Sequence, residues 1–376
     1  MRNLITILAL AAMVACTSQK KSGETSIFLD NEAFDTIIDG KEINLLTLKN
    51  DSGITVYLTN YGARIVGILA PDKNGALADI VPGFNNIGDY LNDPIYLGCI
   101  VGRYANRINE ARFILDGLEF NLYRNEGDNT LHGGRKGLDK RIWTATQDGN
   151  SITMTYLSPD GEEGYPGNLN LKKTFTLNAD NSLKLEYEAE TDQPTVINLT
   201  NHTYWNLRGE GDSTILDHYC QINADYYTPI DKEWIPTGEI ASVSGTPFDF
   251  REGKPVGKDI AADDEQLGNG LGYDHNWVLN KDSAGSFSFA AKLWEESTGR
   301  FIKVSTTEPG MQLYSGNFLK GTVVGKSGRP YVYRSALIFE TQHFPDSPNH
   351  ENFPSTVLRP GEKYTQHTLY EFGVEK

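Results

Sequence analysis

Apolar and polar residues alternate along most of the chain, and a period of two is typical of β-strands with one buried face. Every second residue of 182–190 is apolar, and residues 168–177 largely repeat the pattern. Because Asp180 and Asn181 lie between these segments, we expect a hairpin there. Further strands are expected at 54–59, 64–70, 111–115, 151–157, 195–200, 218–223, 301–306, 311–315 and 364–371.

Helical periodicity is weak throughout, and only short helices are expected, near residues 85–92 and 259–267. Strands without regular helices between them favour antiparallel sheets that pack on one another. No linker divides residues 30–376, and no internal repeat indicates a propeller or a solenoid. We therefore predict an all-β fold, a large antiparallel β-sandwich that forms a single domain over residues 30–376.

The first residues differ from the rest and predict an export signal. Arg2 precedes an apolar run over residues 4–15, which is shorter than the ~20 residues of a membrane span. Met13-Val14-Ala15-Cys16 is similar to a bacterial lipobox, in which the cysteine is lipidated. We predict a lipoprotein signal peptide over residues 1–15, a lipid anchor on Cys16 and a flexible tether over residues 16–29. The alternative is an ordinary signal peptide with a chance cysteine.

Charge and cysteine content narrow the class of protein further. The net charge of −16 argues against a nucleic-acid partner, because phosphate backbones attract basic surfaces. Cys99 and Cys220 form no disulfide framework, and we expect both to be free and buried. No metal-ligand spacing or phosphate-binding glycine loop occurs, so neither a metal nor an organic cofactor is expected. We expect a monomer that contacts a membrane only through its anchor, on the periplasm-facing side.

A single glutamate, Glu340, is the first candidate for chemistry. It ends the apolar run of the segment ALIFETQH at 336–343, and a proline-rich loop follows. Burying a carboxylate at the end of an apolar strand costs free energy unless the protein uses it. Taken alone, Glu340 fits a hydrolase acid, a metal ligand or a paired structural charge equally well.

Five other clusters place polar residues beside strands, at 98–108, 129–134, 198–207, 272–277 and 308–317. The arginines and the asparagine of the first cluster suit a hydroxyl-rich ligand, although pairing with surface acids would explain them too. His202 lies among aromatic residues and asparagines that suit sugar faces and hydroxyls. A buried histidine satisfied by a backbone carbonyl is the alternative. Together the clusters suit proton transfer on a carbohydrate.

In this order, the clusters resemble the galactose mutarotase (aldose 1-epimerase) family. The matching segments are GRYANRI at 102–108, NTLHGG at 129–134, NLTNHTYWNL at 198–207, YDHNW at 273–277, EPGMQLYSGN at 308–317 and ETQHFPDSPN at 340–349. The resemblance covers nearly all of residues 34–373. It implies a β-sandwich of the supersandwich type and a cofactor-free interconversion of the α and β anomers of free aldoses such as galactose and glucose.

The resemblance also implies a role for each matching residue. Glu340 would be the general base that takes the proton of the anomeric hydroxyl, and His202 the general acid that protonates the ring oxygen. His132 would hold the substrate near that oxygen. Sugar hydroxyls would be bound by Asn106, Arg107, Asp274 and Gln312. We expect a nearby carboxylate to keep His202 protonated, and a bell-shaped pH–rate profile.

Three other functions remain open at this stage. A mutarotase for phosphorylated hexoses would need extra basic residues around the phosphate. A glycoside hydrolase would use Glu340 and Asp274 as its two carboxylates, about 5–9.5 Å apart. A sugar-binding lipoprotein on the same fold would need neither proton-transfer group.

Overall fold

The structure is a computed structural model that describes residues 28–375. The predicted signal peptide, Cys16 and most of the predicted tether lie outside the described residues. Within 28–375 the only α-helices are α1 (Ile87–Tyr90) and α2 (Glu265–Gly270). Short 3-10 helices lie at Asn31–Ala33, Asn109–Ala111, Leu138–Lys140, Glu162–Gly164 and Ser347–Asn349. The all-β prediction is confirmed.

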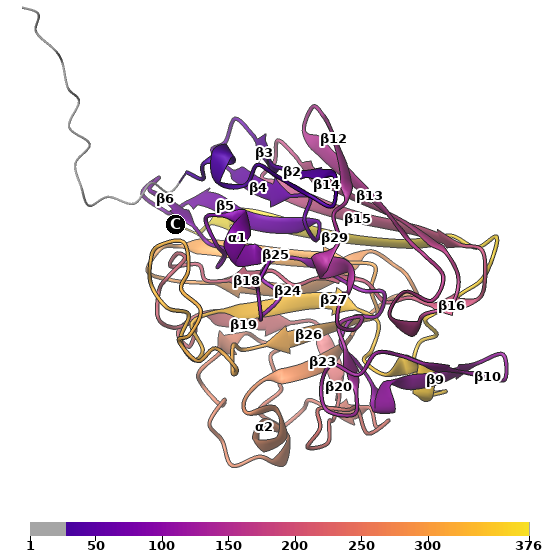
Figure 1. The fold of residues 1–376 in the computed structure, drawn as a ribbon. Coiled ribbons are helices and arrows are strands. Elements are labelled where there is room, and N and C mark those ends of the chain that lie inside the picture. The colour runs from indigo at the N-terminus through magenta and orange to yellow at the C-terminus, as the bar shows by residue number, and fades with distance from the viewer. Residues whose placement is uncertain (1–27, 376) are drawn as a thin grey trace, which may run out of the picture.

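The largest sheet has nine antiparallel strands and runs across the molecule (Figure 1). In spatial order they are β12 (Thr144–Asp148), β13 (Ser151–Ser158), β14 (Leu169–Leu177), β15 (Ser182–Thr191), β29 (Tyr364–Val374), β25 (Arg300–Thr306), β24 (Ser288–Trp294), β19 (Tyr219–Ile222) and β22 (Lys254–Pro255). The C-terminal β29 pairs with β15 and β25, so it joins the middle of the chain to its last third.

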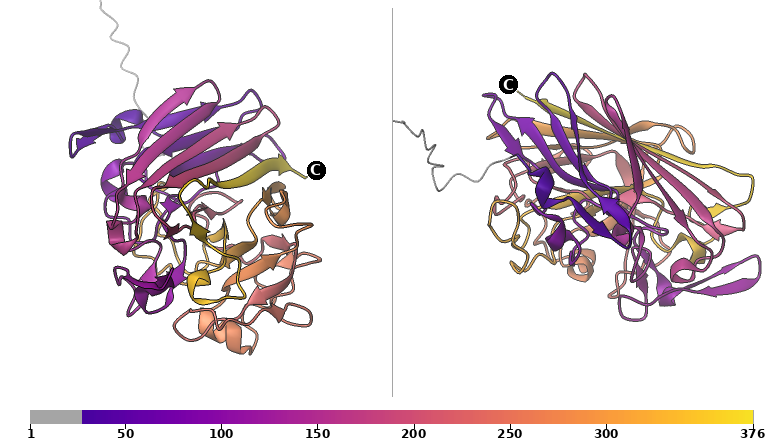
Figure 2. Two further views of the ribbon diagram at one scale, coloured as in Figure 1. Left: turned by 90° about the vertical axis from the view of Figure 1, so that its right-hand side faces the viewer. Right: turned by 45° about the horizontal axis from the view of Figure 1, so that its top comes forward.

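A six-stranded sheet packs against this one. Its order is β18 (Tyr204–Trp205), β27 (Leu337–Gln342), β26 (Gly310–Tyr314), β23 (Asp274–Leu279), β20 (Ala224–Thr228) and β21 (Ala241–Ser242). A third sheet of four strands consists of β3 (Leu45–Lys49), β4 (Thr55–Thr59), β5 (Arg64–Pro71) and β6 (Leu77–Asp79). Figure 2 shows these layers from two further sides.

Five two-stranded pairs complete the fold. They are β1 (Thr36–Ile38) with β2 (Lys41–Ile43), β7 (Ile100–Val101) with β17 (Thr200–Asn201), β8 (Arg107–Ile108) with β11 (Thr130–Leu131), β9 (Arg112–Leu115) with β10 (Leu118–Asn121), and β16 (Thr195–Val196) with β28 (Val357–Leu358). The β7–β17 and β8–β11 pairs carry the histidine segments of the site.

The predicted hairpin is present as β14 and β15. Phe175 pairs with Leu185, and Asn178 donates its backbone N–H to the carbonyl of Ser182 across the turn, at 2.8 Å. The inward residues of both strands are buried in one core with residues of the six-stranded sheet such as Leu313 and Phe339. The alternation therefore has the predicted physical cause, burial of one face.

Two segments differ from their predictions. The single strand expected at 195–200 is divided into β16 and β17, because β16 pairs with β28 and β17 pairs with β7. The helix expected at 259–267 begins later, at Glu265, because the Asp264 side chain accepts the N–H groups of Gln266 and Leu267 as an N-cap. β29 extends three residues beyond its expected end, and the other predicted strands lie within one or two residues of their expected bounds.

Cys99 and Cys220 are buried and free, as expected. No helix within residues 28–375 combines the length and the hydrophobicity needed to cross a bilayer.

β27 positions Glu340. Every residue of β27 is buried, because both faces of the strand are covered. Thr341 contacts Thr368 of β29 through their hydroxyls at 2.7 Å, so it faces the nine-stranded sheet. Since side chains alternate along a strand, Glu340 faces the opposite way, toward the site. A strand covered on both faces reads as a continuous apolar run, which explains the sequence before Glu340.

Candidate active site

A row of buried polar side chains lies on one face of the six-stranded sheet. Asn276 of β23 pairs with Gln312 of β26, which in turn pairs with Glu340 of β27. All three are at most 2% exposed. Asn276 Oδ1, Gln312 Oε1 and Glu340 Oε2 have no hydrogen-bond partner among the described residues. Buried oxygens without partners are costly, so this row is suited to a ligand with hydroxyl groups.

His202 faces Glu340 from a different segment. It follows β17, where its N–H donates to the carbonyl of Cys99 and its carbonyl accepts from the N–H of Gly98, both at 2.9 Å. Its Nε2 lies 3.8 Å from Glu340 Oε1. This exceeds a hydrogen bond, so the two groups are not bonded to each other and both remain available to a substrate beside them.

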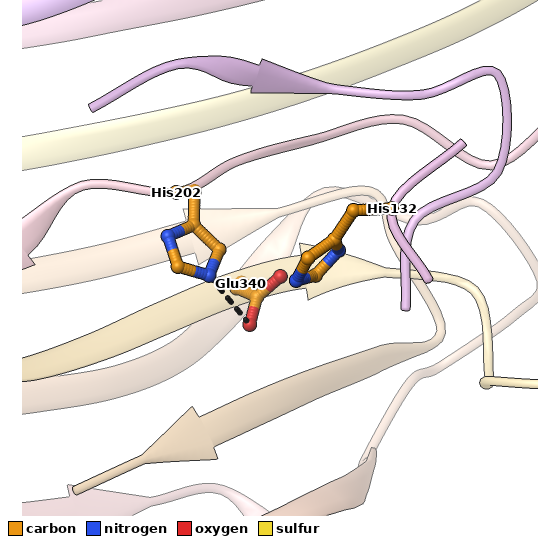
Figure 3. Close-up of side chains that lie close together, drawn as sticks. All are labelled: His132, His202 and Glu340. Atoms are coloured by element: carbon orange, nitrogen blue, oxygen red, sulfur yellow. Dashed lines mark ion pairs between the residues drawn. The ribbon is translucent and has the colours of Figure 1, made fainter. Parts of the chain in front are cut away.

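His132 completes a cluster of three with His202 and Glu340 (Figure 3). The rings of His132 and His202 meet edge to face, with centroids 5.0 Å apart. The following Gly133 lets the backbones approach closely: a Cβ there would lie 1.9 Å from the carbonyl oxygen of Gly102. The paired glycines of the sequence therefore serve a close backbone approach.

The tautomer of His132 decides what this cluster can bind. Donor atoms of His132, His202 and Glu340 lie within 4.8 Å of one another, a spacing that a metal ion could use. His132 Nδ1, however, accepts the backbone N–H of Asn106 at 3.1 Å. The proton of the neutral ring is therefore on Nε2, which makes that atom a donor and not a metal ligand. The cluster is better suited to hydrogen bonding and proton transfer than to metal binding.

Asn106 and Arg107 line the cavity beside His132. Asn106 has a left-handed backbone, with φ 62°, and its Oδ1 accepts the N–H of Arg107 at 2.9 Å. The Arg107 guanidinium makes a two-point ion pair with Glu126, at 2.6 and 2.9 Å. This pair fixes the plane of the guanidinium and leaves donors for other groups.

Asp274 and Gln312 are directly linked: Gln312 Nε2 donates to Asp274 Oδ1 at 2.8 Å. Asp274 lies at the start of β23, where β23 pairs with Tyr314 of β26. Burial raises the pKa of the Asp274 carboxyl, while the charge of Arg107 opposes the rise. Asp274 thus presents a fixed acceptor to the cavity.

Burial decides the protonation of the central pair. It raises the pKa of Glu340 to about 8, aided by the charge of Asp274 and opposed by that of Arg107. It lowers the pKa of His202 to about 3, opposed in part by the Tyr96 carbonyl. It also places the pKa of His132 well below its usual value. The expectation that a nearby carboxylate keeps His202 protonated is wrong for the unliganded protein, since desolvation outweighs an attraction across 3.8 Å.

These side chains surround one cavity of about 210 Å³. Of the residues predicted for the site, Asn106, Arg107, His132, His202, Asp274 and Glu340 line it, and Gln312 lies beneath Asp274. A larger hollow of about 470 Å³ lies over the outer face of the nine-stranded sheet, but its Glu188 is paired with Lys172 and Lys363. The smaller cavity is thus the one with unpaired buried groups.

Sequence reasoning missed part of the wall. The further lining residues are Pro94, Ile95, Tyr96, Glu126, Leu131, Tyr204, Trp234, Tyr314 and Phe318. Tyr204 and Tyr314 belong to recognised clusters, and their aromatic character was a usable signal. Glu126 and Trp234 lie in segments with no such signal, and only tertiary structure brings them beside Arg107.

The comparisons with known proteins agree with this geometry. The family model "Aldose 1-epimerase" matches residues 44–371. The chain is 42% identical to the galactose mutarotase of Rattus norvegicus over 89% of this chain and 95% of that protein. It is 39% identical to the aldose 1-epimerase of Escherichia coli over 90% and 97%. An aldose epimerase homologue from C. elegans has a similar structure, with a TM-score of 0.83, 34% identity and coverage of 89% and 100%.

Proposed function

The chain belongs to the aldose 1-epimerase family, and we propose that it interconverts the α and β anomers of free aldoses, with galactose and glucose as substrates. The observation that carries the proposal is the facing pair of Glu340 and His202 at 3.8 Å, in a cavity where Glu340 Oε2 has no hydrogen-bond partner among the described residues. Together, these groups can move one proton onto the sugar ring oxygen and another off the anomeric hydroxyl.

In the proposed reaction, Glu340 removes the proton of the anomeric hydroxyl while His202 protonates the ring oxygen, and the C1–O5 bond breaks. The open-chain aldehyde then rotates about C1–C2, and the reverse transfers close the ring on the other face. His132, whose Nδ1 accepts the N–H of Asn106, would donate its Nε2–H near the ring oxygen. Asn106, Arg107, Asp274 and Gln312 bind the remaining hydroxyls and hold the sugar during rotation.

The resting position of the shared proton follows from the pKa values. At neutral pH Glu340 holds it and His202 is neutral, because both pKa values are shifted toward the uncharged forms. We propose that sugar hydroxyls solvate the carboxylate and that the proton then passes to His202. The pair carries one proton in both arrangements, so the active enzyme and the resting enzyme differ only in where that proton lies.

The competing functions receive less support from the cavity. Among the described residues that line it, Arg107 is the only lysine or arginine, and Glu126 already pairs with it. A phosphorylated sugar would therefore meet little free positive charge. A hydrolase would use Asp274 as its second carboxylate, but Asp274 already accepts from Gln312 and two histidines flank Glu340 instead. A pure sugar-binding protein would need no Glu340–His202 pair.

Polarimetry on freshly dissolved α-galactose and α-glucose tests the proposal. The wild-type protein should accelerate the approach to anomeric equilibrium, and Glu340→Gln and His202→Asn should each abolish most of that acceleration. A wild-type protein that leaves the spontaneous rate unchanged would contradict the proposal.

We also propose that the protein is exported as a monomeric lipoprotein, anchored through Cys16 to a periplasm-facing membrane surface. The support is the lipobox-like Met13-Val14-Ala15-Cys16 after an apolar run. Such an enzyme would act on sugars released outside the cytoplasm before their uptake. Cys16→Ser should move the protein from the membrane fraction to the soluble fraction and abolish labelling by a fatty-acid analogue. Unchanged fractionation and labelling would contradict the anchor.

A further inference from the structure

The cavity wall is a chain of aromatic contacts that begins at His202 and ends at Arg107. Its members are His202, Tyr204, Tyr314, Phe318, Trp234 and Arg107, with successive ring or ring–cation distances of 5.3, 6.2, 5.9, 5.6 and 5.3 Å. Trp234 is the member that joins the aromatic residues to the guanidinium.

The loop that carries Trp234 holds it in an unusual backbone conformation. Trp234 has φ 61°, in the left-handed region that costs a bulky residue free energy. Asp231 holds the loop: its side chain accepts the N–H groups of Glu233 and Ile235, and its carbonyl accepts that of Trp234 at 3.2 Å. The loop therefore fixes the direction of the indole against the Arg107 side of the cavity.

The indole N–H of Trp234 is shielded from solvent and has no partner among the described residues. By contrast, Trp143 and Trp277 donate to the carbonyls of Leu138 and Phe248, at 3.3 and 3.0 Å. Trp205 also lacks a partner, but it lies in the apolar core and not in the cavity wall. Among residues 28–375, Trp234 is thus the one tryptophan that lines the cavity and has an indole N–H without a partner.

We propose that Trp234 is a further substrate-binding residue: its N–H donates to a sugar hydroxyl, and its ring, edge-on to Phe318, covers a C–H face of the sugar. The inference rests on the proposed function, because it takes an aldose as the occupant of the cavity. Trp234 would thus be an aromatic residue of the site that selects among sugars by the position of one hydroxyl group. The strained loop is explained as the cost of presenting that donor.

The decisive variants are Trp234→Phe, which keeps an aromatic ring but removes the donor, and Trp234→Leu, which removes both. Phe and Trp are both non-glycine residues, so the backbone strain is the same and Trp234→Phe should fold. Trp294→Phe is the matched control, since Trp294 stacks on Tyr219 away from the cavity. Loss of one neutral hydrogen bond should raise KM about three- to tenfold for Trp234→Phe, with kcat nearly unchanged.

Two further readouts separate sugar binding from a purely structural role. Galactose should change the tryptophan fluorescence of the wild type and of Trp294→Phe, and this change should be absent in Trp234→Phe. Within a panel of singly deoxygenated galactoses, one analogue should show the same KM with the wild type and with Trp234→Phe. That analogue lacks the hydroxyl that accepts from the indole.

The outcomes distinguish this inference from the proposed function. Absence of mutarotase activity in the wild-type protein would contradict the proposed function itself. Active wild type, together with Trp234→Phe of unchanged KM and unchanged fluorescence response, would overturn the role of Trp234 alone. A raised KM that persists for every deoxy analogue would also overturn the hydrogen bond.

Discussion

The end of β27 contributes one member to each of two histidine–glutamate pairs, and the pairs behave in opposite ways. Glu340 faces His202 at 3.8 Å, with both side chains at least nine-tenths buried. Three residues later, His343 is hydrogen-bonded through Nδ1 to Glu308 at 2.7 Å and is 22% exposed. The pKa of His202 falls to about 3, whereas the pKa of His343 rises above its usual value.

Contact distance explains the difference. Burial lowers the pKa of His343 too, but the charge of Glu308 and its hydrogen bond outweigh that effect. Glu340 and His202 have no such bond, and His202 Nδ1 and Glu340 Oε2 have no partner among the described residues. A pair in contact stabilises its own charges and is structural. A pair held apart in a dry cavity keeps its proton available for a substrate.

Neutralising each glutamate gives the largest contrast. Glu340→Gln should lower kcat for galactose mutarotation by ~10²–10⁴-fold, because it removes one positioned proton-transfer group. Glu308→Gln should leave kcat within about twofold, since Glu308 does not line the cavity. Polarimetry measures both. Equal losses of kcat in the two variants would contradict the functional distinction between the two histidine–glutamate pairs.

The pH dependence should follow the pKa values of the Glu340–His202 pair. The active pair carries one proton, so kcat/KM should fall about tenfold per pH unit above a value near 8, where the pair loses that proton. The rate should also fall in acid, near pH 3, because protonation of His202 there gives the pair a second proton. Stopped-flow polarimetry between pH 4 and 10 tests the basic limb. Undiminished kcat/KM up to pH 10 would contradict the assignment.

Neutralising Glu340 and neutralising Glu308 should change the free energy of unfolding in opposite directions. The pKa of Glu340 is raised in the folded protein. Its contribution to the stability of the fold is therefore fully present below about pH 4.5 and is lost as the pH rises through 8. Glu340→Gln removes an ionised buried group at pH 9 and should stabilise the fold there by on the order of 2 kcal/mol, with little effect at pH 4. Thermal or urea unfolding at both pH values measures the difference.

Glu308→Gln should instead destabilise the protein by ~1–3 kcal/mol, because His343 loses a charged, hydrogen-bonded partner. The pKa of His343 is raised in the folded protein. The stabilisation by this pair is therefore fully present below about pH 6.5 and is lost as the pH rises through the pKa of the folded protein. Unfolding at pH 6 should therefore show a larger loss than unfolding at pH 9. The reverse order would contradict a charged His343.

The smallest expected effect concerns Arg107, whose charge lowers the pKa of Glu340. Arg107→Met should move the basic limb of kcat/KM upward by roughly 0.5–1 pH unit, on top of a raised KM. Arg107→Lys keeps the positive charge and is the matched control, with a limb near that of the wild type but a raised KM from the lost two-point geometry. A limb that moves equally in both variants would exclude a charge effect.

Local patterns predicted much of the fold because strands with one buried face alternate. The β14–β15 hairpin and most strand positions follow from that alone. The division of 195–200 into β16 and β17 did not, because it depends on two distant partners, β28 and β7. In the same way, six residues that line the cavity were predicted from the recognised motifs, whereas Glu126 and Trp234 reach Arg107 only through folding.

The sequence by itself determined the all-β class and the family and named part of the site, because alternation and ordered motifs are local features of the chain. Tertiary structure alone decided the state of that site. Separate segments bring His132, His202 and Glu340 together, and their burial sets where the shared proton lies. A pKa depends on desolvation and on charges a few ångströms away, and neither quantity is local in sequence.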